Sequence, residues 1–159
     1  DENELRGYPI AELRYPNAAE MRYMCFSAIA QGVNGLAFYS YARSTPPDPQ
    51  WAEQTAAPVL RAVRTFTDRV RTTPLQRRRA AEENQLLLSR WAKGKSTYIL
   101  LANASPETRR IEQAVDGSWP DGELRAWGET RAVEATLQDG KITVAEAKPW
   151  EIFIWSVAP

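Results

Sequence analysis

The side chains that could do chemistry in this chain are carboxylates, hydroxyls and basic groups, because histidine is absent and Cys25 is the single cysteine. The usual general base near neutral pH and the commonest metal ligand are therefore missing. One thiol forms no intrachain disulfide, no zinc site of cysteine and histidine, and no cysteine–histidine nucleophile pair. Any reaction would rest on Asp, Glu, Tyr, Lys, Arg or Ser, and the sequence predicts no cofactor and no bound metal.

One short segment gathers such groups together. Tyr39, Tyr41 and Arg43 end or follow an apolar run, and Trp51 stands beyond a proline-rich loop. A flat aromatic ring can stack on the face of a sugar, and a guanidinium group can donate hydrogen bonds to hydroxyls. The alternative is structural: the tyrosines would pack against a helix, and Trp51 would anchor a helix start.

Composition narrows the class of partner. Lys plus Arg and Asp plus Glu number 20 each, so the formal net charge is zero. This balance creates no long-range field for nucleic acid or an anionic membrane, and we expect neither as a partner. No stretch approaches the roughly 20 apolar residues that span a bilayer. The acidic start does not resemble a signal peptide, so localisation stays unknown, although an extracellular or periplasmic location is compatible with the sequence.

Two helices and a strand are predicted in the first half. Asn17 followed by Glu20 has the pattern of a capping box, and apolar residues at helical spacing predict a helix over 17–32. The aromatic, apolar run 36–41 predicts a strand that is covered on both faces, which is typical of a parallel sheet. Helical spacing returns over 51–72, where a proline either starts or kinks the helix.

A single helix–strand–helix unit cannot bury its own apolar faces. A (β/α)8 barrel takes about 250 residues, far more than this part of the chain supplies. We therefore expect residues 1–76 to be the C-terminal segment of such a barrel, whose other strands would precede Asp1. The predicted fold class is α/β plus all-β, with this barrel segment followed by a small antiparallel β-sandwich.

The second half has short β-rich runs separated by turn signals. Residues 77–83 are polar and predict a linker, and residues 84–159 predict the antiparallel sandwich. Hairpin turns are expected at Ala92–Lys95 and at Gln138–Lys141, the second because Asp-Gly favours a two-residue turn. The strands are expected near 85–92, 96–103, 108–115, 122–127, 131–137, 140–145 and 150–157.

Four stretches carry a resemblance to a known family. They are Pro16–Met24, Ala28–Tyr41, Tyr98–Ser105 and Lys148–Trp155, about a quarter of the chain. The first two resemble the final helix and strand of TIM-barrel glycoside hydrolases, most closely β-galactosidase-like enzymes and their uncharacterised relatives. The last two resemble strands of the β-sandwich that follows such barrels.

The resemblance implies a role in carbohydrate chemistry. Active-site residues of barrel enzymes lie at the carboxyl ends of strands, which makes Tyr39, Tyr41, Arg43 and Trp51 the predicted substrate-binding residues for an oligo- or polysaccharide. Glycoside hydrolysis needs two carboxylates, and in the enzymes that this chain resembles they come from earlier strands. We therefore predict no catalytic residue here and no hydrolase turnover by the chain alone.

Two alternatives remain open, both without catalysis. The chain could be a carbohydrate-binding module, for which the sandwich tryptophans are candidates, or a purely structural sandwich. Trp119 lies in a loop and would bind sugar if exposed, but packing over the sheet end is the competing interpretation. The expected macromolecular partner is a missing N-terminal barrel portion or another copy of the chain. The sandwich tryptophans are Trp91, Trp119, Trp127, Trp150 and Trp155.

Overall fold

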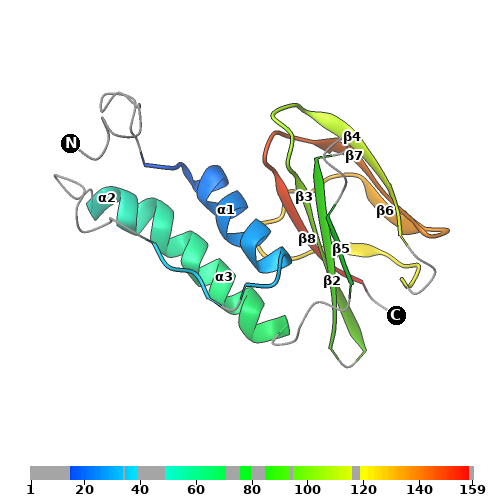
Figure 1. The fold of residues 1–159 in the computed structure, drawn as a ribbon. Coiled ribbons are helices and arrows are strands. Elements are labelled where there is room, and N and C mark those ends of the chain that lie inside the picture. The colour runs from blue at the N-terminus through cyan, green and yellow to red at the C-terminus, as the bar shows by residue number, and fades with distance from the viewer. Residues whose placement is uncertain are drawn as a thin grey trace.

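The computed structural model describes residues 15–33, 35–38, 49–70, 76–79, 85–93, 95–115 and 119–157. These residues form three layers: helices, a five-stranded sheet and a three-stranded sheet (Figure 1). The five-stranded sheet, called sheet A below, has the strand order β1-β2-β3-β8-β5, and the three-stranded sheet B has the order β4-β7-β6. All neighbouring strands are antiparallel. The strands are β1 (Gln76–Arg79), β2 (Leu86–Lys93), β3 (Ser96–Asn103), β4 (Arg109–Ala114), β5 (Leu124–Ala126), β6 (Ala135–Gln138), β7 (Lys141–Ala147) and β8 (Ile152–Val157).

Helix α1 (Ala18–Ala30) begins at the predicted capping box. The Asn17 side chain accepts from the backbone N–H of Glu20 at 3.0 Å, and the Glu20 carboxylate accepts from the backbone N–H of Asn17 at 2.9 Å. The helix ends where Gly32 takes a positive φ of 86°, a conformation that glycine adopts without a steric penalty. The predicted helix over 17–32 is confirmed.

The second predicted helix is present as three joined pieces, α2 (Pro49–Trp51), η3 (Ala52–Ala56) and α3 (Ala57–Val70). The wide π-helical turn of η3 lies directly before Pro58, where the backbone N–H of Ala57 donates to the carbonyl of Ala52. Proline has no N–H to donate, and its ring clashes with the carbonyl four residues earlier. The wider turn accommodates Pro58 without breaking the helix.

The described residues of the predicted parallel strand over 36–41 do not form a strand. Residues 35–38 have no strand structure, while residues 39–41 lie outside the described part of the chain. Leu36 packs against the helix–sheet core, but the side chain of Phe38 is exposed. The described residues therefore form a small α+β domain with two antiparallel sheets, and they do not confirm the helix–strand–helix unit of a barrel.

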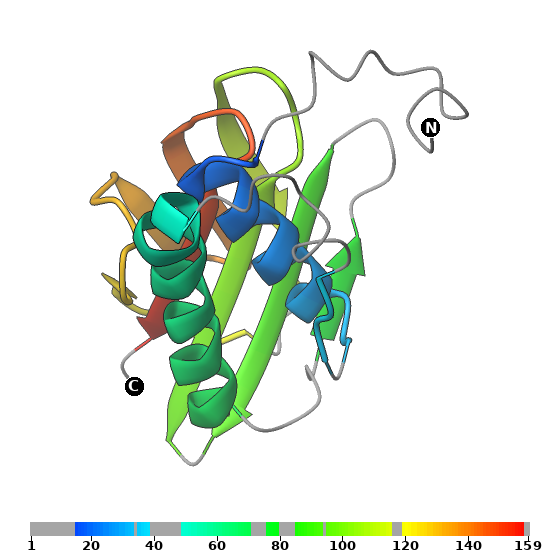
Figure 2. The same cartoon turned by 90° about the vertical axis from the view of Figure 1, so that its left-hand side faces the viewer.

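Sheet A lies between the helices and sheet B and is covered on both faces (Figure 2). Along β3, Leu100 and Ala102 contact the helices, while Ile99 and Leu101 face sheet B. The same alternation follows β8, where Ile154 belongs to the helix-facing core and its neighbours to the other. The helices thus bury their apolar faces on the sandwich itself, whereas the sequence suggested a separate parallel sheet.

The sandwich strands agree closely with the sequence prediction, and both hairpin turns are observed. Lys93 pairs with Ser96 at the β2–β3 turn. Between β6 and β7, Asp139 and Gly140 have φ values of 51° and 68°, the two positive angles of a type I′ turn. Strand β1 pairs with β2 and extends into the predicted linker 77–83. The division into barrel segment, linker and sandwich stays a prediction.

Candidate functional site

Of the four predicted substrate-binding residues, Tyr39, Tyr41 and Arg43 lie outside the described residues, and Trp51 ends α2. The Trp51 indole N–H donates to the carbonyl of Pro16 at 2.7 Å. Its ring stacks on Tyr15, with centroids 4.7 Å apart and planes 22° from parallel. Trp51 therefore fastens the start of the second helix to the residues before α1, and its role in saccharide binding stays a prediction.

Most of the sandwich tryptophans serve packing. Trp91 and Trp155 are fully buried, and Trp127 is half-buried against the helix–sheet core. Trp119 is buried as well, and the guanidinium of Arg90 lies over its ring at 5.4 Å from the centroid. The interpretation of Trp119 as an exposed sugar-binding residue is therefore wrong, because the ring is part of the core between the sheets.

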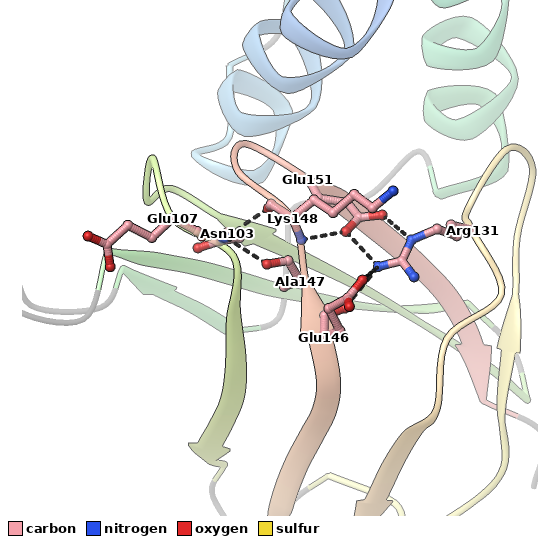
Figure 3. Close-up of polar contacts among 7 residues, drawn as sticks. All are labelled: Asn103, Glu107, Arg131, Glu146, Ala147, Lys148 and Glu151. Atoms are coloured by element: carbon pink, nitrogen blue, oxygen red, sulfur yellow. Dashed lines mark hydrogen bonds and ion pairs between the residues drawn. The ribbon is translucent and has the colours of Figure 1, made fainter.

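A charged cluster holds the turn between β7 and β8 (Figure 3). Arg131 donates two hydrogen bonds to the carboxylate of Glu151, from Nε at 2.8 Å and from Nη2 at 3.0 Å. The same Nη2 donates to the backbone carbonyl of Glu146 at 3.0 Å and lies 3.5 Å from its carboxylate. The backbone N–H of Lys148 adds a third hydrogen bond to Glu151, at 2.8 Å.

The hydrogen bonds within this cluster shift the pKa values of Glu151 and Arg131. Burial alone would raise the pKa of Glu151, but hydrogen bonds from Arg131 and Lys148 outweigh it, and the pKa is lowered overall. The hydrogen bonds to Glu151 raise the pKa of Arg131. A general acid near neutral pH needs a raised carboxyl pKa, so Glu151 is suited to anchoring the turn and not to proton transfer.

Asn103 closes the corner where sheet A passes into sheet B. Its buried amide group Nδ2 donates to the carbonyl oxygens of Glu107 and Lys148 at 2.9 and 2.8 Å, and to that of Ala147 at 3.3 Å. Its Oδ1 accepts from Arg109 Nε at 2.9 Å. One side chain thereby satisfies backbone groups from two connections, which fixes the end of β7 beside the turn that Arg131 holds (Figure 3).

The turn held by this cluster presents Trp150, which contacts Tyr23 of α1 edge to face at a centroid separation of 5.2 Å. All six tryptophans lie in the described part of the chain, and among them Trp150 alone is exposed. The sequence placed Trp150 with the other sandwich tryptophans. Its neighbour Pro149 indicates a turn, but only the structure distinguishes its exposed ring from the buried ones.

Within the described ranges, no group of three or more His, Cys, Asp or Glu side chains could hold a metal ion. No helix in those ranges is long and apolar enough to cross a membrane.

Comparisons with known proteins show the fold of the chain. No family model matches it, and no curated protein matches it. Two solved structures are similar: AmyP in complex with maltotriose, at TM-score 0.54 and 10% identity, and an Anoxybacillus α-amylase described as a new glycosyl hydrolase subclass, at 0.51 and 15%. Each match covers 89% of this chain, but the chain spans only 35% and 32% of those proteins.

These structures are similar to the chain in the arrangement of helices and sheets, and at such identities the likeness concerns the fold alone. Nothing in the comparison supports the β-galactosidase-like assignment.

Proposed function

We propose that this chain is the C-terminal portion of a glycoside hydrolase-like, carbohydrate-active protein, in which it supports a catalytic barrel and borders the substrate cleft. The resemblance of Pro16–Met24 and Ala28–Tyr41 to the end of a barrel supports the proposal, as does the fold likeness to proteins more than twice as long. The likeness to an α-amylase and to a maltotriose complex favours α-linked glucans as the substrate class.

The observation that carries the proposal is the outer surface of α1. Apart from Glu20, Arg22 and Ser27, the residues of the helix are apolar or aromatic. Sheet A and α3 cover part of this helix, and another part is left open. Met24 remains 53% exposed, and Val33 and Phe38, in the segment that follows, are each 45% exposed. In the proposed protein the barrel covers this surface, so it is hidden from water.

The substrate-binding residues fit the same arrangement. Tyr39, Tyr41 and Arg43 belong to the segment between the two helices, and Trp51 is fixed at its far end by Pro16 and Tyr15. Under the proposal, this segment contacts the saccharide through aromatic rings and the guanidinium group of Arg43. The catalytic carboxylates come from the barrel portion, so the chain alone hydrolyses nothing.

The test compares turnover by two proteins: this 159-residue chain, and a longer polypeptide in which it follows further βα units. Both are assayed with maltoheptaose and with a panel of aryl α- and β-glycosides. We expect turnover by the longer protein only, with kcat/KM reduced at least tenfold by Arg43→Ala. Hydrolysis by the chain alone, or an inactive longer protein, would overturn the proposal, and the second result would favour a non-catalytic module.

A further inference from the structure

We draw no further inference here: the strongest candidate, the exposed surface patch that the ring of Trp150 forms on the β7–β8 turn where it meets Tyr23 of α1 edge to face, carries none, because nothing in the structure shows what covers it.

Discussion

The two sheets differ in how many of their faces are covered, and this difference explains the pattern of the sequence. Strand β3 of sheet A is buried continuously from Tyr98 to Asn103, because helices lie on one face and sheet B on the other. Strand β7 of sheet B alternates instead, with Ile142 and Val144 buried and Ala145 exposed. A continuous apolar run thus indicates a strand covered on both faces, and it does not by itself indicate a parallel sheet.

The substitution with the largest expected effect on stability removes an aromatic ring at the centre of the core between the helices and sheet A. Phe66 of α3 is fully buried and meets the rings of Phe26, Trp91 and Trp127 at centroid distances of 5.3–5.8 Å. Phe66→Ala should lower the free energy of unfolding by about 3–5 kcal/mol, because it leaves a cavity that the neighbours cannot fill. Urea unfolding of the full chain measures this.

The matched variant on the other side of sheet A is Leu137→Ala, which opens the core between the sheets. Its expected cost is about 2–5 kcal/mol, so both cores should be essential. If Phe66→Ala costs under about 1 kcal/mol while Leu137→Ala is severe, the helices are loosely attached and sheet A is held from one side only.

The second test concerns the corner that joins the two sheets. Asn103→Ala removes the partner of three backbone carbonyls and of the Arg109 side chain, and the site is buried. Unsatisfied buried groups cost about 1–3 kcal/mol, and we expect a loss of unfolding free energy in that range. Gln113→Ala, at a partly exposed position of β4, is the control. Equal stability of the two variants would mean that water replaces the Asn103 network.

Much of the fold could be predicted from local signals. The capping box of Asn17 and Glu20 placed α1, and Asp139 with Gly140 placed the β6–β7 turn, because each depends on residues adjacent in sequence. The partner of an apolar face is not encoded locally. The sequence showed that both helices needed a sheet beneath them, but not that the sandwich supplies this sheet, since those contacts join residues far apart in the chain.

The candidate site was less predictable for the same reason. Tyr39, Tyr41 and Arg43 were chosen because strand ends carry active sites in barrels, and that argument depends on a strand that residues 36–38 do not form. The exposed ring of Trp150 becomes visible only when the burial of each tryptophan is known. Its one sequence signal is the preceding Pro149, which favours a turn.

A smaller test addresses the polar link between α1 and sheet A. The buried hydroxyl of Ser89 on β2 donates to the carbonyl of Ala30 at 2.8 Å, and this carbonyl lies in the last turn of the helix, where intrahelical donors run out. Ser89→Ala should cost about 0.5–1.5 kcal/mol of unfolding free energy. Ser156→Ala, which breaks a long 3.5 Å contact at a more exposed position, should cost less. A larger effect of the Ser156 variant would contradict this placement of the helix.

The smallest expected effect compares two carboxylates whose pKa values are both lowered. Glu151 lies largely buried beside sheet A, whereas Glu112 of sheet B is exposed and owes its lowered pKa to Lys141 and Arg110. A lowered folded-state pKa adds stability above the ordinary value of about 4.3, and that stability is lost as pH falls through the folded pKa. In both Glu→Gln variants, the free energy of unfolding should therefore fall less steeply than in the unmodified chain as the pH drops below about 5.

The two carboxylates should differ in how strongly salt weakens their ion pairs. Exposed ion pairs are screened at high ionic strength, and pairs with little exposure much less so. In about 1 M salt, Glu112→Gln should have the same acid unfolding profile as the unmodified chain, while the profile of Glu151→Gln should remain distinct. The measurement is the unfolding temperature between pH 3 and pH 7 at low and high salt. If salt removes both differences, the Arg131–Glu151 pair is screened like an exposed one, and the turn that carries Trp150 is less firmly fixed than its hydrogen bonds indicate.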